Sequence, residues 1–201
     1  MLKRDLLSGI SAGLVIALGG SVFLACENRY VGAVLFSVAL LCICFKGYAL
    51  FTGKVGYIPV AHGKAEWQLL LLGLLGNLIG TFISGVAVRY AIPAIGETAL
   101  TTCTAKLSQT AMSTLIRGIF CGLLMYLAVS TYRDNKTPLG IMFCIPVFIL
   151  SGFEHSIADM FYFAASGIVS AKACGFLWLV IIGNSIGGML LPALKIGGEK
   201  P

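Results

Sequence analysis

The chain has 201 residues, of which 58% are hydrophobic and 11% are charged, and its formal net charge is +6. This composition, with a mean hydropathy of +0.96, excludes an ordinary water-soluble domain and indicates a protein that buries its apolar surface in lipid. The basic residues lie mostly between apolar runs, where a membrane-orientation signal explains them better than nucleic-acid binding does.

Six apolar runs are long enough to cross a bilayer, which takes about 20 residues in a helix. We predict membrane spans at residues 6–25, 32–53, 67–92, 107–132, 138–167 and 173–194, joined by short loops. The first run has no clear small-residue cleavage site, so we expect it to stay in the protein as a helix. The sequence therefore predicts a single all-α membrane domain over residues 1–201.

Basic residues are unevenly divided between the two sides of the membrane in this topology. If both ends lie on one side, that side collects Lys3, Arg4, Lys54, Lys64, Arg133, Lys136, Lys195 and Lys200, whereas the other side collects mainly Arg29, Arg89 and Lys172. Cytoplasmic loops carry an excess of lysine and arginine. We therefore predict that both termini are cytoplasmic.

Two glycine patterns recur between the halves of the chain. The third span contains Gly-Asn-Leu-Ile-Gly at 76–80, and the sixth contains Gly-Asn-Ser-Ile-Gly at 183–187. Gly9 and Gly13 of the first span likewise correspond to Gly118 and Gly122 of the fourth. Glycines four residues apart let helix backbones approach closely. Repeats of about 1–95 and 105–195 with three spans each must be inverted across the membrane, which places a solute site between the second and fifth spans.

The second and fifth spans are the ones that the sequence predicts to be interrupted. The second is interrupted over residues 46–54 and resumes at Val55, and the fifth has Pro146 followed by a break at Ser151 and Gly152. The fifth span also carries Glu154, His155 and Asp159 within the apolar run 139–169. Ionisable groups at that depth cost several kcal/mol each, so they usually mark a solute path, and a broken helix is tolerated there only beside a cavity. This pattern is typical of a channel or transporter. The seven cysteines show no metal-site spacing, and we expect no metal or other cofactor.

Five motifs in this chain resemble those of the formate/nitrite transporter family of bacterial and archaeal anion channels. They are Leu50-Phe51-Thr52-Gly53, residues 76–80, Arg117-Gly118-Ile119 with Cys121, Ser151 to Ala158 with Met160-Phe161, and residues 183–188. The resemblance implies an aquaporin-like fold, a homopentamer in the inner membrane with one pore per subunit, and passage of small monovalent anions or their conjugate acids.

The resemblance also implies roles for particular residues. His155 matches the central pore histidine, Thr52 matches a threonine on the loop that interrupts the second helix, and Asn184 matches an asparagine facing the pore. Lys106 resembles the vestibule lysine at the start of the fourth span. The apolar constrictions correspond to Phe36, Leu40, Leu50, Phe51 and Phe148.

This chain departs from the family pattern at several places. Ala49 stands in place of an acidic residue, and Gly122 and Asp159 each stand in place of an asparagine. Most of the amphipathic segment that precedes the first span in the family is also missing from the sequence. The resemblance therefore does not imply gating by such a segment in this chain.

The hypothesis that follows is a proton-coupled passage of weak acids. Lys106 attracts the anion, the constriction strips its water, and Thr52, Asn184 and His155 supply hydrogen bonds. Since the unperturbed pKa of histidine is about 6.5, His155 also serves as a proton relay. Glu154 is expected to accept N–H groups freed at the helix break, and Asp159 either orients the imidazole or pairs with a cation. Lys106 is equally compatible with a solvated lysine at a span end.

Two other functions are compatible with parts of the sequence. An intramembrane hydrolase would use Ser156 and His155, although neighbours in a helix point about 100° apart. An aquaporin-like channel for neutral solutes would share the architecture, but the two Asn-Pro-Ala boxes that signal water or glycerol channels are absent from the sequence. The sequence does not distinguish formate, nitrite, hydrosulfide, acetate and lactate as the transported species.

Overall fold

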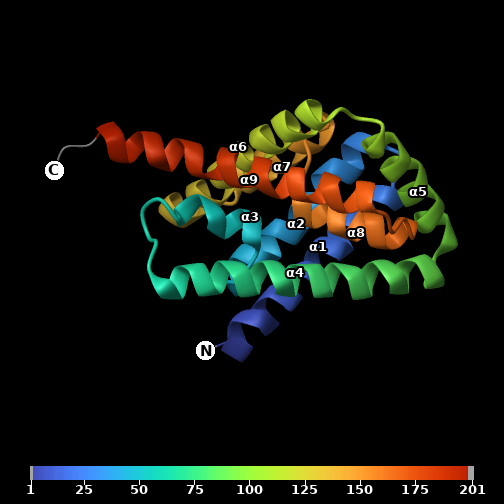
Figure 1. The fold of residues 1–201 in the computed structure, drawn as a ribbon, viewed down its shortest axis with the longest axis horizontal. Coiled ribbons are helices and arrows are strands. Elements are labelled where there is room, and N and C mark those ends of the chain that lie inside the picture. Colours follow the sequence, from blue (N-terminus) through green and yellow to red (C-terminus); the bar gives the residue numbers. More distant parts are fainter. Residues whose placement is uncertain (1, 199–201) are drawn as a thin grey trace.

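The computed structural model describes residues 2–198, and throughout this range the regular elements are helices (Figure 1). Residue 1 and residues 199–201, including Lys200, lie outside the described part of the predicted domain. The elements are α1 (Leu2–Ala25), α2 (Arg29–Lys46), α3 (Phe51–Lys54), η1 (Val55–Tyr57), α4 (Lys64–Ala91), α5 (Pro93–Leu107), α6 (Ala111–Asn135), α7 (Leu139–Leu150), α8 (Ser156–Ser166) and α9 (Ala171–Gly198).

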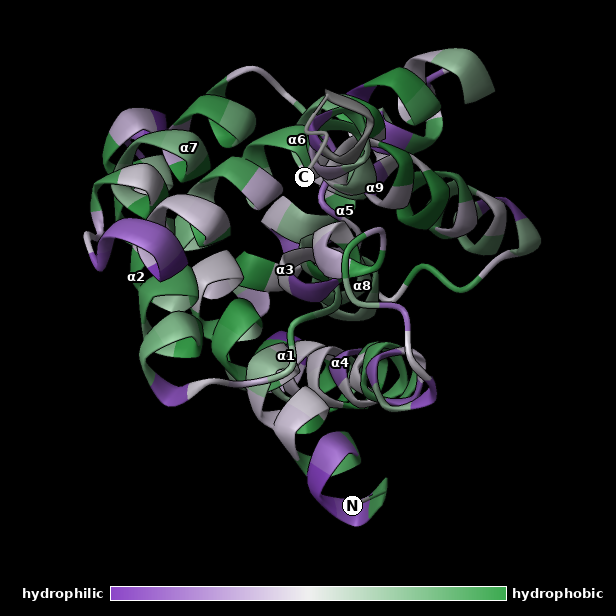
Figure 2. Ribbon diagram, turned by 90° about the vertical axis from the view of Figure 1, so that its left-hand side faces the viewer, coloured by the Kyte–Doolittle hydropathy of each residue, from purple (hydrophilic) through white to green (hydrophobic). Residues whose placement is uncertain are grey.

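Five of the described helices, α1, α2, α4, α6 and α9, are long and apolar enough to cross a membrane. Only 39% of the most apolar window of each is buried inside the protein, so most of its side chains need lipid or a neighbouring protein around them. Figure 2 shows hydrophobic residues along the helices at the outer edge of the molecule as well as at its centre. The fifth predicted span, 138–167, consists of two shorter helices, α7 and α8, separated by residues 151–155.

Glycines in the left-handed conformation mark the ends of both predicted interrupted helices. α2 ends at Lys46, where Gly47 has a φ of 69° and its N–H donates to the carbonyl of Cys44. α7 ends at Leu150, and Gly152 follows with a φ of 70°. A residue with a side chain rarely adopts this conformation, so the helices stop where the sequence supplies glycine. Pro146, in contrast, lies inside α7 without ending it.

The helix α5 corrects the sequence analysis, which treats residues 93–106 as a loop. Pro93 occupies the start of this helix, and Ile95, Ala99 and Cys103 form its buried face at a spacing of four residues. The prediction was wrong because threonines lower the hydropathy of the segment. Their hydroxyls donate to carbonyls one turn back, as Thr102 does to Thr98 and Thr104 does to Leu100, so they are compatible with a helix.

Glycines bring α1 against α4 and α6 against α9, the helix pairs in which the sequence analysis finds its recurring pattern. A Cβ atom built on Gly9 would lie 2.6 Å from the carbonyl oxygen of Gly73, and one on Gly13 would lie 2.6 Å from that of Asn77. A Cβ atom on Gly118 would lie 3.2 Å from the Cα of Gly183. A side chain at Gly9 or Gly13 would therefore push the helices apart, and one at Gly118 would be tight.

A Gly13→Ala variant is expected to be less stable by about 1–3 kcal/mol, because α1 must move away from α4 to admit the methyl group. Thermal unfolding in detergent, followed by tryptophan fluorescence, measures the effect. Gly175→Ala is the matched control, since a Cβ atom on Gly175 of α9 meets nothing within 4 Å. Equal melting temperatures for the two variants would contradict the prediction.

Candidate functional site

The centre of the candidate site is a hydrogen bond between Thr52 and His155, which lie in the two interrupted regions. Thr52 Oγ1 and His155 Nε2 are 2.9 Å apart, and both residues are buried. His155 is also the N-cap of α8, where its Nδ1 accepts the N–H of Ala158 at 3.1 Å. Because Nδ1 is an acceptor, a neutral ring carries its proton on Nε2 and donates it to Thr52. The structure therefore joins both breaks through one buried imidazole.

Asn77 of α4 holds the break between α2 and α3. Its Oδ1 accepts the N–H of Phe51 at 2.9 Å, and its Nδ2 donates to the carbonyls of Gly9 at 2.8 Å and Ala49 at 2.9 Å. The side chain is fully buried, so these bonds replace those that the backbone loses when the helix stops. Asn77 is not among the site residues predicted from the sequence, although it lies in the repeated Gly-Asn motif.

Asn184 of α9 makes the corresponding contacts at the break between α7 and α8. Its Oδ1 accepts the N–H of Ser156 at 2.8 Å, and its Nδ2 donates to Gly118 at 2.9 Å and Glu154 at 2.8 Å. All three partners are backbone groups. The sequence analysis assigns Asn184 a hydrogen bond to the solute, whereas in the structure its amide positions the segment that carries His155.

The five residues of the predicted constriction are all buried, with at most 4% of their surface exposed: Phe36, Leu40, Leu50, Phe51 and Phe148. Phe148 stacks on the imidazole of His155 with ring centroids 5.6 Å apart, and Phe36 meets Phe148 edge to face at 6.3 Å. The polar Thr52–His155 pair therefore lies among apolar side chains.

A cavity of about 670 Å³ reaches His155 and Phe148 from one side. Phe23 and Leu24, at the C-terminal end of α1, are among the residues that line it. Its charged lining residues are Arg29, Lys106, Arg117, Glu154 and Asp159. The structure thus brings together His155, Lys106 and both carboxylates that the sequence analysis predicts, at one polar vestibule.

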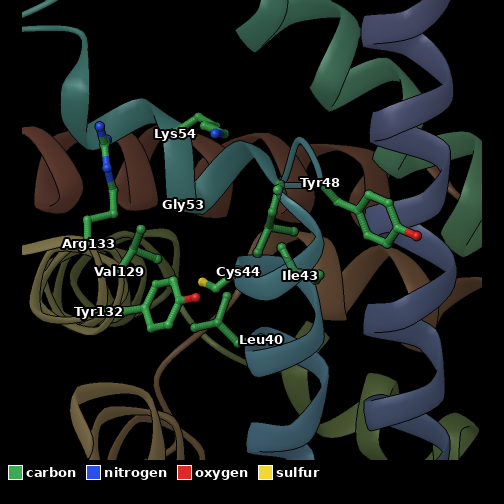
Figure 3. Close-up of a pocket in the computed structure, with 11 residues that line it drawn as sticks. Leu40, Ile43, Cys44, Tyr48, Gly53, Lys54, Val129, Tyr132 and Arg133 are labelled. Carbon is green, nitrogen blue, oxygen red and sulfur yellow. The ribbon is translucent and has the colours of Figure 1, made fainter. Parts of the chain in front are cut away.

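A smaller cavity of about 80 Å³ lies on the other side of the constriction, against Leu40 and Leu50. Lys54 of α3 and Arg133 of α6 border it, together with apolar residues such as Val129 (Figure 3). Gly47 and Tyr48 line both this cavity and a third one formed with the N-terminal residues of α1. Since α1 has 24 residues, its two ends are about 36 Å apart, and the vestibule and this third cavity lie beside opposite ends of it.

The sequence identifies Lys54 and Arg133 only as orientation signals. Their approach depends on α3 packing against α6, which the sequence does not reveal. Arg133 also lies over the ring of Tyr57, with its guanidinium carbon 4.0 Å from the ring centroid. The smaller cavity therefore has cationic side chains at its border.

Lys106 forms a buried ion cluster with the two acidic residues of the vestibule. Its Nζ contacts Glu154 Oε2 and lies 3.0 Å from Asp159 Oδ1. Lys106 is at the last turn of α5 and is only 14% exposed at its side chain, so it is not a solvated loop-end lysine. Asp159 pairs with a cation, which decides between the two roles that the sequence leaves open.

The contacts of Glu154 correct its predicted role. Its carboxylate contacts Lys106 and accepts a hydrogen bond from Gln109 Nε2 at 2.7 Å. The prediction was that this carboxylate accepts N–H groups freed at the helix break, but among the described residues its hydrogen bonds come from side chains. The N–H of Glu154 donates instead to the carbonyl of Arg117 at 3.3 Å.

Two arginines donate to backbone carbonyls at the C-terminal end of α7 and just beyond it. Arg117 Nη1 donates to Gly152 at 2.9 Å, and Arg29 Nη2 donates to Ile149 at 3.1 Å. The C-terminal end of a helix carries a partial negative charge, so cationic side chains are stabilising there. Arg117 therefore has a structural contact within the subunit, where the sequence left its role open.

The hydrolase alternative requires a bond between Ser156 and His155, and the described residues do not form one. Ser156 Oγ is buried and has no hydrogen-bond partner in the described part of the chain. Both ring nitrogens of His155 are engaged by Thr52 and Ala158. A serine nucleophile needs a base within hydrogen-bond reach, so this geometry does not favour hydrolysis.

Comparison with known proteins agrees with a transport protein. The chain is 28% identical over 210 residues to the nitrite transporter NirC of Salmonella typhimurium, covering 92% of this chain and 76% of NirC. It is 26% identical over 190 residues to the formate channel FocA of Haemophilus influenzae, covering 82% of this chain and 66% of FocA. The names of these relatives point to a protein that is not an enzyme.

Solved structures and a family model extend this comparison to the whole fold. An FNT family ion channel superposes with a TM-score of 0.80 at 24% identity, over 100% of this chain and 90% of the other. A pentameric formate channel with formate bound gives a TM-score of 0.79 at 24% identity, over 98% of this chain and 96% of the other. The model of the family described as formate/nitrite transporter matches residues 2–196. With its apolar helices, the protein is a multi-pass membrane protein, and it belongs to the formate/nitrite transporter family.

Proposed function

We propose that the protein is a channel that passes small monovalent anions of weak acids, such as formate, nitrite, hydrosulfide or short carboxylates. The observation that carries the proposal is the buried Thr52–His155 pair, which lies among apolar rings with a cavity on each side. Relatives named as a nitrite transporter and a formate channel support this class of substrate.

Desolvation explains why the site contains both apolar and polar groups. A bare anion loses its hydration among Phe36, Phe51 and Phe148, at a cost of roughly ten kcal/mol or more in a low dielectric. That cost falls if the anion takes up a proton and crosses as the neutral acid. The Nε2–H of His155 and the hydroxyl of Thr52 then bond the solute where it has no water.

A proton relay through His155 makes a specific demand on this geometry. The ring must hold protons on both nitrogens, whereas Nδ1 accepts the N–H of Ala158 in the structure. Protonation of Nδ1 therefore requires the first turn of α8 to release this bond, at a net cost of about 1 kcal/mol. His155 acts as a fixed hydrogen-bond donor while the bond is closed, and it relays a proton when the bond opens.

The proposed architecture is an inverted three-plus-three repeat, with interrupted second and fifth spans, that assembles as a homopentamer. The matching hydrogen bonds of Asn77 and Asn184 to the two breaks support the repeat. The start of α1 and the end of α9 lie toward the same side of the molecule in Figure 1, in agreement with an even number of crossings. The excess of basic residues on that side supports cytoplasmic termini in the inner membrane.

A flux measurement in proteoliposomes tests the proposed function. Formate, nitrite, hydrosulfide, acetate and lactate are offered across a pH series, and proton movement is followed with a dye inside the vesicles. Faster entry of at least one weak acid than in protein-free vesicles is expected, with co-movement of protons. If only glycerol or water flux increased, the neutral-solute alternative would replace the proposal.

Replacing Lys54 with glutamine is expected to slow anion flux severalfold at low ionic strength, because the smaller cavity loses a cation that concentrates anions at its border. The difference should shrink in high salt, which screens this attraction. Lys64→Gln, at the exposed start of α4, is the matched control. Initial flux rates at two salt concentrations measure the effect, and equal rates for both variants at low salt would contradict it.

A further inference from the structure

Among the described residues, the vestibule holds two carboxyl groups and one ammonium group in direct contact with them, while the guanidinium groups of Arg29 and Arg117 donate to backbone carbonyls near the end of α7. Lys106 contacts both Glu154 and Asp159, whose side chains are 2% and 1% exposed. If all three groups were ionised, the cluster would carry a net charge of −1. A buried charge without a partner is strongly disfavoured, so the cluster favours the uptake of one proton.

Hydrogen-bond donors distinguish the two carboxyl groups. Glu154 receives donors at both oxygens, from Lys106 and from Gln109. Asp159 pairs with Lys106 through Oδ1. Its Oδ2 is buried and has no hydrogen-bond partner among the described residues. Donors at both oxygens stabilise the ionised carboxylate. An oxygen without a donor is the one at which protonation is least unfavourable. The proton therefore belongs on Asp159 Oδ2.

We propose that Asp159 is a carboxylic acid at rest and that its Oδ2–H binds the incoming anion in the vestibule and protonates it. This inference rests on the proposed function and identifies the group that supplies the proton. The Oδ2–H bond breaks as a bond forms between the proton and an oxygen, or a sulfur, of the anion. Asp159 is left as a carboxylate beside Lys106, and water in the vestibule returns the proton.

The charged state of Asp159 also controls the entry of the next anion. With Asp159 neutral, Lys106 and Glu154 balance, and the cluster does not repel an anion. With Asp159 ionised, the cluster is negative and disfavours an anion in the cavity. Channel flux of the anion should therefore fall as rising pH removes the proton from Asp159.

Other titratable groups also lie close to Asp159. Cys103 of α5, Cys121 of α6 and Tyr162 of α8 all lie close enough to interact electrostatically with it. Neutral thiol and phenol groups carry no positive charge, so they cannot balance the carboxylate that Lys106 leaves uncompensated. His155 accepts the N–H of Asp159 through its backbone carbonyl, and its ring is directed to Thr52 and Ala158. None of these groups replaces Asp159 as the source of the proton in the vestibule, and the relay through His155 acts at the constriction beyond it.

Asp159→Asn tests the inference, because asparagine keeps the shape and an acceptor for Lys106 but can neither ionise nor give up a proton in this way. At acidic pH its weak-acid flux should be severalfold below that of the unmodified protein. At alkaline pH its flux should be severalfold above, since its cluster stays neutral. Coincident pH profiles of the two proteins, both eluting as folded assemblies, would overturn the proposal.

Infrared spectroscopy of the full-length protein gives a second readout that does not depend on transport. The band of a protonated carboxylic acid is expected near neutral pH in the unmodified protein and should be lost in Asp159→Asn. Asp5→Asn is the matched control, because Asp5 is also buried but accepts a hydrogen bond from Gln68 away from the vestibule. A band that survives in Asp159→Asn overturns this inference, whereas absence of flux in every protein overturns the proposed function.

Discussion

An Asn184→Ala variant is expected to lose about 2–6 kcal/mol of folding free energy. The substitution leaves the N–H of Ser156 and the carbonyl of Glu154 without the partner that the amide supplies. Each buried polar group that loses its partner costs about 1–3 kcal/mol. Both groups lie where α7 has stopped and α8 has begun, so the backbone offers them no substitute within a helix.

Thermal unfolding in detergent, together with the yield of monodisperse protein, measures this loss. Asn77→Ala should behave in the same way, because Asn77 makes equivalent bonds to Phe51 and Ala49 at the other break. Asn135→Ala is the matched control, since that side chain is exposed at the end of α6 and donates only to Thr131. If Asn184→Ala melted within one or two degrees of Asn135→Ala, the anchoring role would be refuted.

A His155→Phe variant is expected to reduce weak-acid flux by roughly 10- to 100-fold. Phenylalanine fills the ring position beside Phe148 but supplies no donor to a solute or to Thr52. A hydrogen bond to a charged group is worth about 1.5–3 kcal/mol, and about 1.4 kcal/mol corresponds to a factor of ten. Flux in proteoliposomes that contain equal amounts of each protein measures the effect.

His155→Asn separates the hydrogen-bond role of the ring from its proton relay. Asparagine is a favourable N-cap residue, and its amide also provides a donor, so α8 and the contact with Thr52 should persist. The weak-acid flux of this variant should exceed that of His155→Phe. Proton movement that depends on the relay should be lost. Conduction by His155→Phe at the unmodified rate would show that the imidazole is not needed.

Much of the candidate site could be predicted because its signals are local in the sequence. A titratable cluster inside an apolar run predicts His155 and its acidic neighbours, since such groups are costly in a membrane unless they serve a path. The glycine after each interrupted helix predicts where the helices stop, as Gly47 and Gly152 do. Helix α5 escaped prediction because hydropathy alone ranks its threonine-rich segment as a loop.

The roles of the polar side chains depended on contacts between distant residues. Asn184 is predicted near the pore, yet its partners at Gly118 and Glu154 are 66 and 30 residues away and belong to backbone that only the packing brings near. Lys106 and Glu154 are 48 residues apart, and their contact forms because α5 packs against α8 and the segment before it.

By itself, the sequence determined that this protein lies in a membrane, that its second and fifth spans are interrupted, and that a histidine lies within an apolar span, because hydropathy and glycine conformation act over a few residues. Only the tertiary structure decided that both asparagines hold the breaks, that Asp159 keeps one oxygen without a partner, and that Lys54 and Arg133 share a cavity. Hydrogen bonds and ion pairs act over about 3–4 Å, so their partners are defined only after the helices have packed.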